Sequence, residues 1–169
     1  MRKGNTRSRD SEFEQKVVEI SRVTRVVAGG KRMRFRALVV IGDKKGRVGM
    51  SLKKGADVSE AVKKASGDAK KELISVPMVR GTIPHQIKAK YKASVVMLKP
   101  APPGTGVIAG GPIRPVVEVA GISNIVCKMM GSASKINNVK ATLKALAGLR
   151  QPKAGRGERK SDNKIVEKK

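Results

Sequence analysis

The chain has 169 residues and a formal net charge of +25, because 38 Lys and Arg residues stand against 13 Asp and Glu residues. The single cysteine excludes an internal disulfide, one cysteine with one histidine cannot build a zinc site, and the longest aliphatic run, residues 38–41, cannot span a bilayer. Between residues 73 and 157 the only carboxylate is Glu118, which speaks against acid–base catalysis. So basic a chain predicts a polyanionic partner, most simply a nucleic acid.

Composition divides the chain into four parts. Residues 1–14 are polar and predict a basic flexible arm, and residues 151–169 predict a basic tail. Residues 15–79 and 80–150 hold the apolar periodicity and predict two α+β domains.

The first domain is predicted to be a β-β-β-α unit. Apolar alternation predicts strands over residues 17–28, 32–42 and 46–52, and the tight turns 28–31 and 42–46 predict two hairpins. Asp57 with Glu60 predicts a capped helix start, followed by one buried stripe. That stripe comprises Val58, Ala61, Val62, Ala65, Ala69 and Leu73.

The second domain is predicted to follow the order β-β-α-β-α. Residues 82–98 predict two strands, residues 100–112 a loop rich in Pro and Gly, and residues 113–120 a short helix. A strand over residues 122–128 and a longer helix that begins near Ser134 complete it. His85 and Cys127 fall on apolar phases and predict packed side chains.

Alternation in the second strand places three arginines on one face. Arg32, Arg34 and Arg36 lie about 6.5–7 Å apart along a strand, a spacing that suits successive phosphates. We expect nucleic acid there, although a merely solvated face is the alternative. The other candidate RNA-binding residues are Arg22, Arg25, Gly29, Gly30 and Lys31 around the first hairpin, Lys44, Lys45 and Arg47 at the second, and Lys53 and Lys54 before the helix.

Residues 104–111, GTGVIAGG, match the dinucleotide-binding pattern G-x-G-x-x-A. That interpretation is rejected because the preceding strand pairs in a hairpin and no acidic residue follows about 20 positions later to bind a ribose. A structured turn and a partner-facing loop both remain open for this segment.

Several motifs resemble the family of bacterial small-subunit ribosomal protein five. They are RVTR at 22–25, GG at 29–30, FRALVVIGD at 35–43, GRVG at 46–49 and above all GTGVIAGG at 104–111. The resemblance implies a first domain like a double-stranded-RNA-binding module and a second domain with a left-handed β-α-β crossover. It implies a cytoplasmic constituent of the small ribosomal subunit that binds ribosomal RNA, supports decoding accuracy and lines the messenger entry path.

The resemblance also implies partners and sites. Val23, Thr24, Arg25 and Gly30 match the loop linked to spectinomycin sensitivity, and small-subunit proteins four and eight are the expected neighbours. Gly104, Gly106, Gly110, Gly111 and Arg114 match the surface toward protein four. Ser51 and Lys53 depart from the family's glycines, which suggests an altered turn after the third strand, and Ser134 is expected to cap the last helix.

Two alternatives remain for the function. One is a free-standing duplex-RNA-binding regulator, and the other is a nucleotide-binding enzyme that uses residues 104–111. Under the favoured interpretation the chain is not an enzyme, and no cofactor, metal, small-molecule substrate or membrane is expected.

Overall fold

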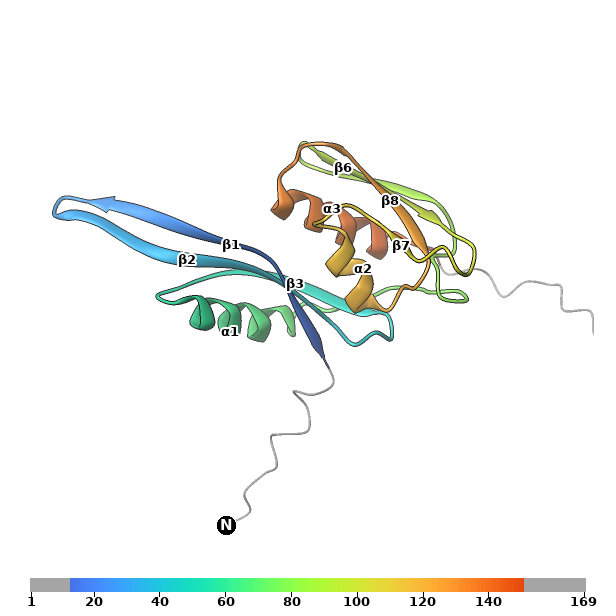
Figure 1. The fold of residues 1–169 in the computed structure, drawn as a ribbon, viewed down its shortest axis with the longest axis horizontal. Coiled ribbons are helices and arrows are strands. Elements are labelled where there is room, and N and C mark those ends of the chain that lie inside the picture. The colour runs from blue at the N-terminus through green and yellow to red at the C-terminus, as the bar shows by residue number, and fades with distance from the viewer. Residues whose placement is uncertain (1–12, 151–169) are drawn as a thin grey trace, which may run out of the picture.

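The computed structural model describes residues 13–150, which form two four-stranded sheets and three helices (Figure 1). The predicted tail and residues 1–12 of the predicted arm lie outside the described residues. Glu14, assigned to the arm from sequence, instead begins the first strand.

The first sheet has the order β1-β2-β3-β4 and is antiparallel throughout. Its strands are β1 (Glu14–Val27), β2 (Gly30–Gly42), β3 (Arg47–Gly55) and the two-residue β4 (Ile74–Ser75), which the sequence did not predict. Helix α1 (Val58–Ala69) covers one face and buries Ala61, Ala65 and Ala69 against Ala37, Val39 and Ile41. The predicted stripe is therefore confirmed for Ala61, Val62, Ala65 and Ala69, whereas Leu73 packs against the same cluster from beyond the end of the helix.

The start of α1 differs in detail from the predicted capping box. Asp57 occupies the N-cap position, but its carboxylate accepts a hydrogen bond from the Ser59 hydroxyl and makes no cap bond to the backbone. Glu60 accepts from the N–H of Ala56 at 2.8 Å, one residue before the N-cap. Glu60 thus bonds back to the turn before the helix, as a capping box requires, while the Asp57 side chain does not cap the helix N-terminus.

The second sheet has the order β5-β6-β8-β7. It comprises β5 (Ile87–Tyr91), β6 (Ser94–Pro100), β7 (Val107–Ile108) and β8 (Ile125–Gly131), with α2 (Arg114–Ala120) and α3 (Lys135–Ala147). Strand β7 lies inside the predicted loop and pairs in parallel with β8. A parallel pair needs a crossover, and α2 supplies it, so β7-α2-β8 is a βαβ unit.

Two predicted strand boundaries and one predicted helix cap in this domain were wrong. Residues 82–86 are not a strand, since only Thr82 bridges back, to Val79. β8 starts at Ile125 because the N–H groups of Ser123 and Asn124 both donate to the Gly81 carbonyl. Ser134 precedes α3, but its side chain makes no cap bond, and its N–H instead donates to the Ser132 hydroxyl.

Both faces of β2 are buried near its base. Leu38, Val40 and Val48 point away from α1 and join one hydrophobic cluster with Val116 and Val117 of α2. The face that carries the arginines further along β2 is therefore buried over this stretch, because the second domain docks there. Beyond Phe35 the β1–β2 hairpin projects past α1 and away from the second domain (Figure 1).

The turn between β2 and β3 forms the joint between the domains. The N–H of Lys44 donates to the Val119 carbonyl and the N–H of Gly46 to the Ala120 carbonyl, each at 3.0 Å. Asp43, with a side chain 1% exposed, contacts the Arg47 guanidinium at 2.6 Å and accepts the N–H groups of Lys45 and Arg47. Burial opposes ionisation of this carboxyl, but the Arg47 side chain and these N–H groups outweigh it, so its pKa lies below 3.8.

Replacing Asp43 with Ala is expected to lower the free energy of unfolding by about 1–3 kcal/mol at neutral pH. The reason is that two backbone N–H groups and the Arg47 guanidinium lose the carboxylate that accepts their hydrogen bonds. Since the folded pKa is lowered, the stabilisation is present above pH 3.8 and is lost as the pH falls through the folded pKa. Denaturant unfolding of both proteins from pH 7 to pH 2 tests this. A difference that persists undiminished at the lowest pH contradicts it.

Candidate nucleic-acid interface

The two faces of the projecting hairpin carry different side chains. Arg25 pairs with Arg32, Val23 with Arg34 and Ser21 with Arg36 in the β1–β2 register. Directly paired residues share a face, so these side chains lie on the face turned away from α1. On β3, Lys54 pairs with Arg36 and joins the same face. We call Arg25, Arg32, Arg34, Arg36 and Lys54 the arginine face.

A groove of about 380 Å³ lies on this surface. Its lining residues are Val23, Thr24, Arg25, Arg32, Arg34 and Lys54, with no carboxylate among them. Glu19, nearer the base of the hairpin, lies 3.7 Å from the ammonium of Lys135. Because no acid lines the groove, its positive potential is left available to a polyanion.

Arg22 and Lys31 lie on the opposite face from the predicted ladder. Arg22 pairs with Phe35 and Lys31 with Val26, and these positions alternate with those of the arginine face. Exposed apolar side chains surround them, including Val26 at 73% and Met33 at 53%. The sequence prediction placed Lys31 in the turn, whereas Lys31 belongs to β2 and alternates with Arg32. It grouped Arg22 with the ladder because it did not fix the register between β1 and β2.

Side chains at the tip of the second hairpin contact other residues of the same chain. The ammonium of Lys44 lies 2.7 Å from Glu14, and Arg47 contacts Asp43 and stacks over Phe13. Lys45 is exposed at the same turn, and its N–H donates to Asp43. This tip thus serves first to join the two domains, and its contact with RNA stays a prediction.

Ser51 and Lys53 lie within β3, where they pair with Val39 and Ala37. The predicted strand end at residue 52 was wrong, since β3 continues to Gly55 and neither residue lies in the turn that follows. Lys53 forms an ion pair with Asp68 of α1. The Lys53 ammonium holds the pKa of Asp68 below its ordinary value, so part of the positive charge predicted here is compensated within the fold.

One amide side chain binds two glycines of the segment 104–111. Asn124 Oδ1 accepts hydrogen bonds from the N–H groups of Gly104 and Gly106, both at 3.1 Å. In a dinucleotide-binding loop such N–H groups face the pyrophosphate. Here Asn124 occupies them, and β7 lies inside the motif, which supports the rejection of that interpretation.

Replacing Asn124 with Ala is expected to free the Gly104 and Gly106 amides and to speed their hydrogen exchange, because both donors lose their acceptor. Asn124→Asp is the matched control, since a carboxylate keeps an acceptor oxygen at the same place. Residue-resolved amide exchange measures the effect. Equal exchange in the Ala variant and the unchanged chain contradicts it.

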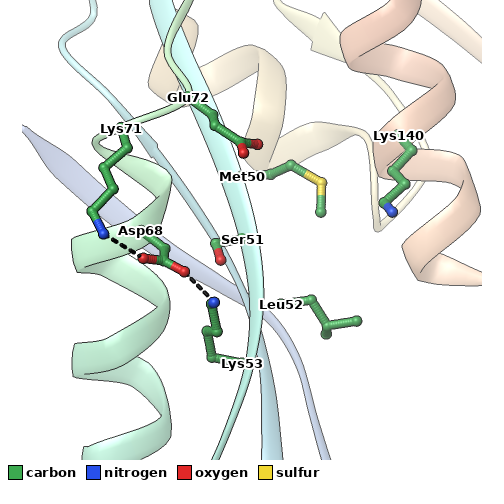
Figure 2. Close-up of a pocket in the computed structure, with 8 residues that line it drawn as sticks. All are labelled: Met50, Ser51, Leu52, Lys53, Asp68, Lys71, Glu72 and Lys140. Carbon is green, nitrogen blue, oxygen red and sulfur yellow. Dashed lines mark hydrogen bonds and ion pairs between the residues drawn. The ribbon is translucent and has the colours of Figure 1, made fainter.

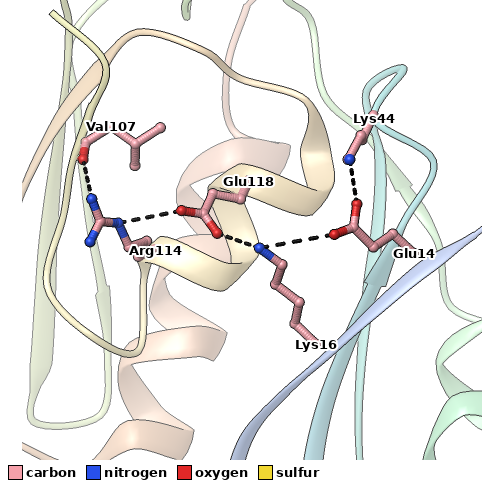
Figure 3. A network of polar contacts seen from close by, with 6 residues as sticks. All are labelled: Glu14, Lys16, Lys44, Val107, Arg114 and Glu118. Atoms are coloured by element: carbon pink, nitrogen blue, oxygen red, sulfur yellow. Dashed lines mark hydrogen bonds and ion pairs between the residues drawn. The ribbon is translucent and has the colours of Figure 1, made fainter.

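Arg114 anchors this loop to the rest of the molecule. Its guanidinium donates to the Val107 carbonyl at 3.2 Å and lies 3.3 Å from Glu118. Glu118 also accepts from Lys16 of β1 at 2.5 Å, and the chain of ions continues through Glu14 to Lys44 (Figure 3). The sequence marked Arg114 but gave no signal for this link between the domains.

The structure shows where the remaining predicted residues lie, and their contacts with partners stay predictions. Val23, Thr24, Arg25 and Gly30 all lie near the tip of the hairpin, and Gly30 has a φ of +132° that suits a tight turn. Gly110 and Gly111 lead into α2. Cys127 is buried, which raises its pKa to about 12 and makes it a packed apolar residue, as predicted. His85 is half-buried rather than fully packed.

Models of two domains match most of this chain. "Ribosomal protein S5, N-terminal domain" matches residues 13–77 and "Ribosomal protein S5, C-terminal domain" residues 89–159. The chain belongs to the ribosomal protein S5 family. This family consists of structural constituents of the small ribosomal subunit and not of enzymes.

Curated relatives carry the name small ribosomal subunit protein uS5. The protein of Mycoplasmopsis agalactiae is 56% identical over 85% of this chain and 62% of its own length. That of Treponema pallidum is 49% identical over 86% of this chain and 85% of its own length. The spinach protein, named uS5c, is 53% identical over 82% of this chain and 46% of its own length. Within residues 13–150, no helix is long and apolar enough to cross a membrane.

Proposed function

We propose that this protein is a structural constituent of the small ribosomal subunit and that its arginine face binds small-subunit ribosomal RNA. The observation that carries the proposal is the acid-free groove along Arg25, Arg32, Arg34 and Lys54. Guanidinium groups donate bidentate hydrogen bonds to phosphate oxygens, and β2 holds them at a fixed spacing.

Shape and phosphate contact are the expected mode of recognition. A-form RNA hides its base edges in a deep, narrow groove, so proteins bind it mainly through phosphates and 2′-hydroxyls. Phe13, Phe35 and Tyr91 are the only aromatic residues of the chain, and Phe13 lies under Arg47. A surface that stacks on single-stranded bases would need more rings than this.

We further propose that the protein neighbours small-subunit proteins four and eight, lines the messenger entry path and supports decoding accuracy. The resemblance in residues 104–111 supports this part. Asn124 and Arg114 hold this loop in one conformation, while Ile108 on it is 54% exposed. A held loop with an exposed apolar side chain suits contact with a protein partner.

Sedimentation of cell extracts tests the central proposal. A tagged copy of the chain is expected to sediment with the small subunit, and to remain there in salt that strips loosely bound proteins. A free-standing RNA regulator would instead remain at the top of the gradient. That distribution would overturn the proposed function.

A further inference from the structure

The first sheet has an open edge. Strand β4 pairs only with Arg47 and Val48 of β3, whereas β3 continues to Gly55. Within the described residues, no strand pairs with the outer edge of β3 beyond Val48. Such an edge is a template for pairing with another extended chain.

The direction of the backbone groups on this edge follows from two hydrogen bonds. The Gly46 carbonyl accepts from Val76 on the outer side at 2.7 Å, while the Arg47 carbonyl accepts from Asp43 on the inner side at 3.2 Å. Backbone groups of a strand alternate between its two edges. Met50, Leu52 and Lys54 therefore turn their N–H and C=O groups outward, and Ser51 and Lys53 turn theirs toward β2.

A groove of about 550 Å³ runs along this edge between the end of α1 and α3 (Figure 2). Its lining residues are Met50, Ser51, Leu52 and Lys53 of β3, Asp68, Lys71 and Glu72 at the end of α1, and Lys140 of α3. Met50 and Leu52 share the side of the sheet that faces the main hydrophobic cluster. An added strand would thus meet apolar side chains on one side and polar ones on the other.

The charge of this groove distinguishes it from the arginine face. Lys53 and Lys71 both form ion pairs with Asp68, and Glu72 adds a second carboxylate. Two acids beside three lysines leave little net charge, so a polyanion gains little here and meets carboxylates. Backbone groups aimed outward from a nearly neutral groove fit a polypeptide rather than RNA.

We propose that the outer edge of β3 docks an extended segment of another protein, which adds a strand to the first sheet beside Met50–Leu52. Its alternate side chains are apolar where they meet Met50 and Leu52 and polar where they meet the Lys53–Asp68–Lys71 cluster. The inference rests on the proposed function in one respect, that the partner is another protein of the small subunit.

Amide exchange distinguishes strand addition from mere contact. In the free chain, the Met50 and Leu52 amides are expected to exchange quickly and the Ser51 and Lys53 amides slowly. In purified small subunits, the Met50 and Leu52 amides should exchange at least about 100-fold more slowly than in the free chain. Unchanged exchange of Met50 and Leu52 in a chain that has entered the subunit overturns the inference and leaves the proposed function intact.

A photo-cross-linking residue in place of Lys71 identifies the occupant of the groove. Lys63 is the control position, because it lies on α1 but does not line this groove. The expected result is a cross-link from position 71 to another small-subunit protein. A cross-link to RNA overturns the inference. So does protection of Met50 and Leu52 in the free chain that disappears when residues 151–169 are removed, since the chain's own tail would then occupy the edge. A chain that does not enter the subunit overturns the proposed function and this inference together.

Discussion

An Arg32→Ala, Arg34→Ala double variant is expected to bind a small-subunit RNA fragment about 30- to 150-fold more weakly than the unchanged chain. Each arginine contributes a charge-assisted hydrogen bond to phosphate, and at about 1–1.5 kcal/mol per contact the two losses give this range. The slope of the logarithm of affinity against the logarithm of salt concentration should become shallower by about 2, because two fewer counterions are released. Titrations at several salt concentrations measure both quantities.

The same hairpin supplies a charge-matched control. The Arg22→Ala, Lys31→Ala double variant also removes two positive charges, but from the face that carries Met33 and Val26. If the arginine face meets RNA, this control should lose far less affinity and keep a steeper slope. Equal losses in the two variants would show that only the total charge of the hairpin counts, and would contradict the assignment of a binding face.

Gly42→Ala is expected to lower the free energy of unfolding by about 3 kcal/mol. A Cβ atom at this position would lie 2.2 Å from the Val119 carbonyl oxygen, and backbone atoms on both sides leave no flexible side chain to yield. Gly121, which follows the last residue of α2, faces the same joint, and a Cβ there would lie 2.1 Å from the Lys44 carbonyl oxygen. The two glycines let the backbones of the two domains touch.

Gly67→Ala is the matched control for this prediction. Gly67 lies in α1, and a Cβ atom added there would meet no atom within 4 Å, so alanine should raise the free energy of unfolding by about 0.5–1 kcal/mol. Denaturant unfolding of the three proteins measures the difference. A Gly42→Ala midpoint equal to that of the unchanged chain would show that the joint can open at no cost.

Local patterns in the sequence predicted most of the elements. The stripe of Ala61, Ala65 and Ala69 identified α1 and its buried face, because helical spacing depends on near neighbours alone. The predicted hairpin turns at residues 28–31 and 42–46 are likewise confirmed. The sequence did not predict the two shortest strands, β4 and β7. Each has two residues and exists only because a distant strand pairs with it.

The composition and motifs by themselves determined that this protein carries a large positive charge, has an α+β fold and resembles a ribosomal family. The tertiary structure decided which cations lie on one face. Strand register placed Arg22 opposite the arginine face, and domain docking buried Leu38 and Val40 on the face that carries the arginines further along β2. The tertiary structure also pairs Lys44 with Glu14 and Arg47 with Asp43. The physical reason is that register, docking and ion pairs depend on residues far apart in the chain, which local periodicity does not sense.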